Sequence, residues 1–243
     1  MLSLSRALVV VMVVVGLVAG SFASPRGVAL AKEKPYNPVI DPADFTDVID
    51  NPFLPMPPGT TFHYETVTPD GLETDDVYIS HDTKLIMGVT CVVVVDTVML
   101  DGVLTELTLD WYAQDVDGNV WYFGEAAEQY DNGILVGTEG SWEGGVDGAL
   151  PGTVMQGDPR PGHAYHQEFL LGVAQDMAQV VGRNAKVHVP YGSFRHCVQT
   201  KEWSPLEPGV VEHKYYAAGV GNVLVIERGG GTLRQVLVDI TTE

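Results

Sequence analysis

The sequence predicts a mainly β protein, with a twisted antiparallel sheet that curls into a partial barrel or a sandwich. Three observations predict this class. The 243 residues include 27 glycines and 15 prolines, which is typical of a turn-rich β protein. Asp-Gly and Gly-Asn turn sequences recur between runs rich in Val, Thr, Tyr and Trp. Several of these runs alternate apolar and polar residues, as half-buried strands do.

The N-terminus has the pattern of a secretory signal peptide over residues 1–31. Arg6 precedes an apolar run at 7–19, and small residues allow cleavage after Ala23 or Ala31. The run is shorter than the roughly 20 residues that a membrane-spanning helix requires. We therefore expect a soluble mature protein that is secreted or held in the periplasm or cell envelope, with no transmembrane segment after cleavage.

Residues 32–59 are rich in proline, which interrupts both helices and sheet ladders. The sequence therefore predicts an extended lead-in here, with one short helical turn within 41–50. Residues 60–243 are expected to form a single β domain.

The strands of that domain are predicted from turn signals and alternation. We expect strands at 77–81, 89–100, 104–113, 120–123, 163–170, 185–189, 194–203, 210–217, 222–228 and 232–240. The strand at 89–100 contains four consecutive valines, which indicates that both of its faces are covered. The strand at 104–113 places Leu107, Leu109 and Trp111 on one face and polar residues on the other.

Residues 166–181 fit two structures. Their apolar residues recur at helical spacing, whereas the alternation from Ala174 to Val180 fits a strand. The chain is therefore expected to contain at most one helix, and helix and strand both remain open for this segment.

An internal repeat relates two stretches of the domain. Cys91-Val92, Trp111-Tyr112-Ala113 and Gly118-Asn119-Val120 recur in the same order as Cys197-Val198, Tyr215-Tyr216-Ala217 and Gly221-Asn222-Val223. The repeat predicts two similar three-stranded meanders. Cys91 and Cys197 occupy equivalent places, and in an exported protein we expect them to form a disulfide, with two buried free thiols as the alternative.

Three motifs carry a resemblance to known proteins. They are Ile49 to Phe53 with the following Pro58 to Phe62, Asp110 to Asp115 with the following Gly118 to Glu125, and Tyr215 to Gly221. Together they resemble a group of bacterial exported proteins of unknown function. The last motif is similar to one in the lipoprotein-carrier fold, and this resemblance implies an incomplete barrel around an apolar cavity. It brings no catalytic residues.

The formal net charge of −19 excludes some partners. A surface of this sign repels the phosphates of nucleic acids and the headgroups of anionic membranes. Nucleic acid is therefore not an expected partner.

Carboxylates offer one possible catalytic site. Glu106, Asp110 and Glu125 are weak candidates for the acid and base of a hydrolase, although a solvated strand face is the simpler interpretation. The sequence therefore assigns a catalytic role to no residue. Ser141 lacks the G-x-S-x-G context of serine hydrolases.

Metal and cofactor sites are not predicted. Asp115, Asp117 and Asn119 resemble the start of a calcium loop, but Val120 and Ala126 stand where that loop needs Gly and Glu. A hairpin turn explains the same residues. His163, His166 and Glu168 lie close together in the sequence without the spacing of a known metal motif.

Clustered aromatic residues give the candidate ligand site: Trp111, Trp121, Phe123, Trp142 and Tyr215. The leading hypothesis is a secreted, non-catalytic binding module for an apolar small molecule or a cell-envelope component. The alternatives are an extracellular carboxylate-dependent hydrolase and a structural protein of surface interactions. The sequence leaves open whether the protein is an enzyme, and the absence of catalytic motifs favours a protein without catalytic activity.

Overall fold

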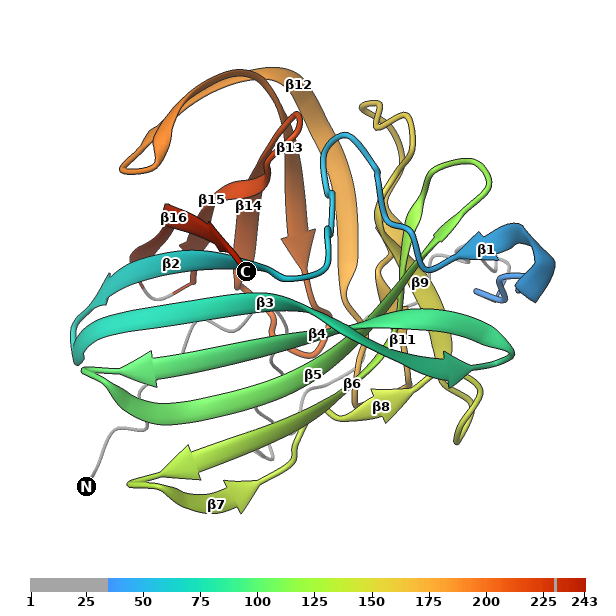
Figure 1. Cartoon of the computed structure of the whole chain (residues 1–243), viewed down its shortest axis with the longest axis horizontal. Coiled ribbons are helices and arrows are strands. Elements are labelled where there is room, and N and C mark those ends of the chain that lie inside the picture. The colour runs from blue at the N-terminus through green and yellow to red at the C-terminus, as the bar shows by residue number, and fades with distance from the viewer. Residues whose placement is uncertain (1–34, 230) are drawn as a thin grey trace, which may run out of the picture.

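The computed structural model describes residues 35–229 and 231–243, and these residues are almost entirely β (Figure 1). The predicted signal peptide at 1–31 lies outside the described residues. A single 3-10 turn, Pro42–Asp44, confirms the expected helical turn. The strands are β1 Phe45–Thr46, β2 Thr60–Thr68, β3 Gly71–Ile86, β4 Val89–Leu100, β5 Val103–Asp115, β6 Val120–Asp131, β7 Ile134–Gly137, β8 Trp142–Glu143, β9 Leu150–Met155, β10 Tyr165–His166, β11 Glu168–Phe169, β12 Met177–Val189, β13 Gly192–Trp203, β14 Val211–Ala217, β15 Gly221–Arg228 and β16 Thr232–Thr242.

The strands form one antiparallel sheet that curls into a nearly closed barrel, which confirms the predicted class. Hydrogen-bonded neighbours follow the order β10-β12-β13-β14-β15-β16-β2-β3-β4-β5-β6-β9-β11. Figure 1 shows β2 to β6 as one wall and β12 to β16 as the other. The two walls join where β16 pairs with β2, in a register that sets Thr242 opposite Thr60.

Residues 165–169, which we call the closing segment, join the other two ends of the sheet. β10 pairs with β12 and β11 pairs with β9, with only Gln167 between β10 and β11. The Gln167 N–H donates to the Asp176 carbonyl at 2.8 Å. A Cβ on Gly152 of β9 would lie 2.4 Å from the Gln167 carbonyl carbon, so this close approach requires glycine.

The closing segment resolves the ambiguity at 166–181 against the helix. The chain forms the short strands β10 and β11, a turn at 170–174, and then β12 from Met177. The apolar residues that mimicked a helical stripe contact both edges of the sheet, and tertiary pairing overrides the local periodicity.

The two meanders are equivalent in register as well as in sequence. In the first meander, β4–β6, Val92 pairs with Tyr112, and in the second, β13–β15, Val198 pairs with Tyr216. Each tyrosine follows a register shift in the ladder to the next strand. The predicted repeat is therefore present as two three-stranded meanders on opposite walls.

The lead-in is not simply extended, because it folds against the outside of the barrel. β1 pairs with the end of β5, and Phe45 packs edge-on against Phe123 with ring centroids 5.4 Å apart. These contacts help to bury an outer cluster: Ile86, Val89, Cys91, Trp111, Ala113 and Phe123. This cover explains why β4 is apolar on both faces.

The expected disulfide is absent, because Cys91 and Cys197 are both buried free thiols. Cys91 lies in the outer cluster and Cys197 lies in the main core. Five strands separate β4 from β13 along the sheet, so equivalent places in the repeat are distant places in the barrel. The alternative of two buried thiols is the one that the structure shows.

Candidate functional site

The polar face of β5 points into the barrel. Glu106, Thr108 and Asp110 are all at most 6 % exposed, whereas Leu109 on the opposite face is 38 % exposed. The interpretation of this face as solvated is therefore wrong. Glu125 of β6, which lies directly opposite Asp110, is buried as well. The weak catalytic candidates are thus brought together, in the interior.

Polar and apolar side chains occupy different layers of the interior. On the inward face of β3, the buried acids Glu73 and Asp75 come first, and the buried apolar residue Ile79 lies further along the strand. The apolar layer includes Phe62, Ile79, Val92, Val198 and Leu237. Among the residues that the structure describes, the polar layer holds eight buried acids and one buried lysine: Glu73, Asp75, Asp96, Glu106, Asp110, Glu125, Glu168, Glu202 and Lys214.

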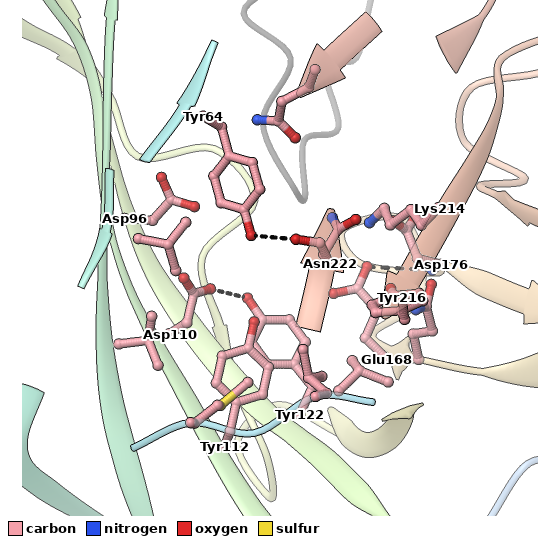
Figure 2. Close-up of a pocket in the computed structure, with 17 residues that line it drawn as sticks. Tyr64, Asp96, Asp110, Tyr112, Tyr122, Glu168, Asp176, Lys214, Tyr216 and Asn222 are labelled. Carbon is pink, nitrogen blue, oxygen red and sulfur yellow. Dashed lines mark hydrogen bonds between the residues drawn. The ribbon is translucent and has the colours of Figure 1, made fainter. Parts of the chain in front are cut away.

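A cavity of about 110 Å³ lies within the barrel where these layers meet (Figure 2). One water requires about 10–15 Å³ by this measure, so the cavity has room for several waters or a compact molecule. Its apolar lining consists of Leu54, Met56, Val77, Val94 and Val154. Its tyrosines are Tyr64, Tyr112, Tyr122 and Tyr216, and its titratable acids and lysine are Asp96, Asp110, Glu168, Asp176 and Lys214.

The tyrosines are fixed by stacking and by hydrogen bonds. The rings of Tyr112 and Tyr122 stack with centroids 4.8 Å apart. The Tyr122 hydroxyl donates to Asp110 Oδ1 at 2.5 Å and lies 3.0 Å from Glu125 Oε2. The Tyr64 hydroxyl donates to the Asn222 carbonyl at 2.9 Å. The aromatic lining is therefore held in place by the barrel itself.

Burial favours the protonated form of the acids in the cavity wall. It raises the pKa of Asp110 to about 8, and the nearby Asp96 adds to this effect. Burial also raises the pKa of Asp75 to about 7 and holds that of Asp96 well above its usual range. Asp75 and Asp96 share a hydrogen bond in which protonated Asp96 is the donor. Asp75 also accepts from Gln235 at 2.6 Å.

Lys214 lies on the opposite wall from Asp96 and Asp110 (Figure 2). Its ammonium group is 3.0 Å from Glu202 and 3.4 Å from Glu212. Burial lowers the pKa of Lys214, but the negative charges of Glu202 and Glu212 outweigh burial and raise it. The charge of this lysine is thus already balanced by two carboxylates on its own side.

One end of the cavity is covered by the lead-in loop, residues 49–56, which contributes Leu54 and Met56 to the lining. Asn51 fixes this loop. Its Nδ2 donates to the carbonyls of Gly118 and Gln156, and its backbone N–H donates to Gln114 Oε1 at 2.8 Å. The Asp50-Asn51-Pro52-Phe53 motif of the sequence is therefore part of the cover of the cavity.

The five predicted ligand-binding aromatics do not line the cavity. Trp111 and Phe123 are in the outer cluster, and the Lys84 ammonium lies 3.4 Å from a Trp111 ring centroid. Trp121 packs against that cluster and donates to Asp115 Oδ2. Their role in ligand binding stays a prediction.

The other two of these aromatics lie nearer the interior. Trp142 is buried and packs edge-on against Tyr122, with ring centroids 5.3 Å apart. Tyr215 is half-buried and packs against the main core. Trp142 thus stands directly behind a residue that lines the cavity.

The tyrosines that line the cavity are not among the five predicted ligand-binding residues. Tyr112 and Tyr216 both follow an acid or a lysine by two positions, and Tyr64 alternates with exposed Glu65. This alternation is visible in the sequence, but the sequence alone does not determine which face of each strand points into the barrel.

Asp110 and Glu125 do not have the arrangement of a hydrolase pair. The Tyr122 hydroxyl occupies the space between their carboxyl groups. Burial also raises the pKa of both groups, whereas hydrolysis by two carboxylates requires one of them to be ionised. The pair therefore gives no specific indication of catalysis.

The motifs considered for metals have other contacts. Asp115 accepts hydrogen bonds from the backbone of Asp117 and from both the backbone and side chain of Asn119, as a hairpin turn requires. The His166 ring packs against the Tyr36 ring in a tilted arrangement, with centroids 4.2 Å apart. Within residues 35–229 and 231–243, no group of three or more His, Cys, Asp or Glu is arranged to hold a metal ion.

Comparisons with known proteins give two structural similarities. No protein-family model matches the chain, and no curated protein matches it. A protein from Bacteroides fragilis, described as exported and with a YmcC-like fold, is 14% identical with a TM-score of 0.46, over 78% of this chain and 99% of its own. A protein from Parabacteroides distasonis, described as a lipoprotein, is 10% identical with a TM-score of 0.42, over 78% of this chain and 98% of its own.

In the part of the chain that the structure describes, no helix has the length and apolar character needed to cross a membrane.

Proposed function

We propose that the protein is a non-catalytic binding protein that holds a small amphipathic molecule inside its barrel, in the cell envelope or outside the cell. The observation that carries this proposal is the internal cavity at the boundary between an apolar and a polar layer. A molecule with one apolar and one polar end would satisfy both layers at once. The signal-like N-terminus of the sequence supports the location.

The two-layer cavity changes the ligand that the sequence analysis favoured. A purely apolar molecule would match only part of the lining, because the polar side chains of Asp96, Asp110 and Lys214 also line the cavity. A polar end is therefore part of the proposed ligand. The wall formed by Leu54, Met56 and Val94 would contact its apolar end.

Native mass spectrometry tests this function on protein purified from its natural host. We expect an adduct that survives in the native spectrum and is lost on denaturation. Val154→Phe fills part of the cavity lining and should abolish the adduct, whereas Val67→Phe, at a position 80% exposed on β2, should retain it. An apo mass for the wild type, or an adduct that persists in Val154→Phe, would contradict the proposal.

A further inference from the structure

We propose that the closing segment, residues 165–169, is the gate of the cavity: it detaches from both edges of the sheet as one piece while the rest of the barrel stays folded. This inference rests on the proposed function only for the molecule that passes the gate, because opening itself is measured without a ligand. Three observations carry it: the segment forms part of the cavity wall, short ladders hold it in the sheet, and a tyrosine of the lead-in packs against it.

The first observation is the place of the segment between the cavity and the two ends of the sheet. Gln167 and Glu168 line the cavity. Val154 of β9 and Asp176, which lies immediately before β12, line it as well. Figure 2 shows Glu168 and Asp176 across the cavity from Asp96. Because the segment joins β9 to β12, its removal would leave a gap between these strands that leads directly to the cavity.

The second observation is how little of the sheet holds the segment. β10 contributes residues 165–166 to its ladder with β12, and β11 contributes residues 168–169 to its ladder with β9. The other seam of the barrel is much longer, since the β16–β2 ladder extends from residue 235 to residue 242. A region held by few backbone pairs opens locally at a lower free energy than a long ladder. The seam at the closing segment is therefore the one that opens first.

The chain on either side of the segment allows it to move as one piece. Residues 160–164, which precede it, are all exposed. Residues 170–174, which follow it, form a turn in which Gly172 has a φ of 78° and open space around its Cα. Hinges are a few loop positions of this kind, which absorb a change in backbone angles.

The third observation is Tyr36, which packs on the segment from the lead-in. Its ring centroid lies 4.2 Å from that of His166 and 6.1 Å from that of Phe169. Its hydroxyl donates to the Pro151 carbonyl of β9 at 2.7 Å, and Pro151 pairs with Glu168 in the ladder. Tyr36 therefore ties the segment to one edge of the sheet by contacts outside the ladder, and acts as a latch on the gate.

Hydrogen–deuterium exchange followed by mass spectrometry tests the gate on the mature protein. We expect residues 163–170 to be protected at least about tenfold less than residues 89–115, which form the β4–β5 hairpin. Equal protection of the two regions would mean that the segment opens only when the barrel unfolds, and would overturn the inference.

Tyr36→Ala tests the latch. Loss of the ring contacts and of the hydrogen bond should lower the protection of residues 163–170 about 5- to 100-fold and leave residues 89–115 unchanged. Tyr36→Phe keeps the ring and should have a smaller effect. Tyr191→Ala, at a position 41% exposed between β12 and β13, is the matched control and should change neither region. An equal loss of protection in both regions of Tyr36→Ala would overturn the inference, because it would report global unfolding.

A reversible staple tests the gate in a second way. Leu150 and Phe169 pair across the β9–β11 ladder. Paired Cα atoms of antiparallel strands lie about 4.5–5.5 Å apart, a distance that a disulfide spans. In the double variant Leu150→Cys with Phe169→Cys, oxidation should raise the protection of residues 163–170 at least about tenfold over the reduced form, which has the same sequence and is the control. Equal protection of the two forms would overturn the inference.

The same double variant separates the gate from the proposed function. The oxidised form should release the adduct seen by native mass spectrometry at least about tenfold more slowly than the reduced form. Equal release rates would overturn the gate and leave the proposed function standing. An apo mass for the wild type would overturn the proposed function, whereas the exchange measurements would still show whether the segment opens.

Discussion

Asp110 and Lys214 occupy equivalent positions in the two meanders and face the same cavity with opposite charge. Each precedes by two residues an inward tyrosine, Tyr112 or Tyr216, which pairs with the valine that follows a cysteine. The two meanders therefore give the cavity one wall with a balanced lysine and one wall with acids only. An internal repeat has produced an asymmetric site.

The buried acids predict an unusual dependence of stability on pH. Burial raises the pKa of Asp110 and Glu106 to about 8 and of Asp75 to about 7, against about 4 for these groups in an unfolded chain. The folded state therefore binds more protons than the unfolded state between these values. Stability is full below about pH 4 for these groups and is lost as the pH rises toward 8.

Each such group changes the free energy of unfolding by about 1.4 kcal/mol per pH unit in that window. Urea unfolding at about pH 5 and about pH 8 should show a loss of at least a few kcal/mol at the higher pH, because the three groups act in the same direction. Lys214, whose pKa is raised, stays charged at both pH values and does not alter the sign. A protein that is equally stable or more stable at pH 8 would contradict this prediction.

Asp110→Asn should reduce this pH dependence. Asparagine keeps a carbonyl oxygen that can accept from the Tyr122 hydroxyl but has no proton to lose. At about pH 8 the variant should be as stable as the wild type or more so, by about 1 kcal/mol. Glu65→Gln is the matched control and should leave the slope of stability against pH unchanged. A steeper slope in Asp110→Asn would count against a buried, protonated Asp110.

Lys214→Met should be strongly destabilising, because it leaves the carboxyl groups of Glu202 and Glu212 without their cation. Breaking a buried ion pair from one side typically costs about 3–5 kcal/mol. The control is Lys186→Met at an exposed position of β12, where a change within about 0.5 kcal/mol is expected. Equal unfolding free energies for the two variants would show that Lys214 is not needed for stability.

The free thiols can be counted by mass. Unfolded protein treated with iodoacetamide without a reductant should gain two carbamidomethyl groups, one on each of Cys91 and Cys197. Folded protein should react slowly, because both thiols are buried and burial raises the pKa of Cys91 to about 12. Labelling that appears only after reduction would reveal a disulfide and contradict the structure.

Asn51→Ala should loosen the cover of the cavity. It removes the donor to the Gly118 and Gln156 carbonyls and the acceptor for the Phe53 N–H. Leaving such groups unpaired costs about 1–3 kcal/mol for each buried one, so we expect a loss of at least about 2 kcal/mol in urea unfolding. Gln179→Ala removes one exposed hydrogen bond, to the Gly162 carbonyl, and should cost under about 0.5 kcal/mol. A similar cost for both variants would mean that the loop is not held by Asn51.

Much of the fold follows from local sequence. The strand predicted at 89–100 coincides with β4, and β2 begins at Thr60, where the ordered sheet was expected. Turn residues and alternation act over a few positions, so a single sequence contains the information that sets these elements. The register equivalence of Tyr112 and Tyr216 was also present in the repeat.

The site was less predictable because it depends on which face of each strand turns inward. On β5 the usual preference for buried apolar residues favours the face of Leu109 and Trp111, yet the lead-in covers Trp111 from outside and the acids point inward. That outcome is decided by contacts between segments far apart in the chain. The disulfide was inferred from the expected oxidising compartment and from the internal repeat. Neither of these observations gives information about the distance between β4 and β13.

The pairing of β2 with β16 has a consequence for the order of folding. The first long strand of the barrel completes its hydrogen bonding only with the last strand of the chain, from Gln235 opposite Thr66 to Thr242 opposite Thr60. Contacts so distant in sequence carry a large loop-closure cost and slow the search for the native state. The edge of β2 that faces β16 therefore stays unpaired in a growing or emerging chain until β16 has formed. During that interval this edge can aggregate or bind a chaperone.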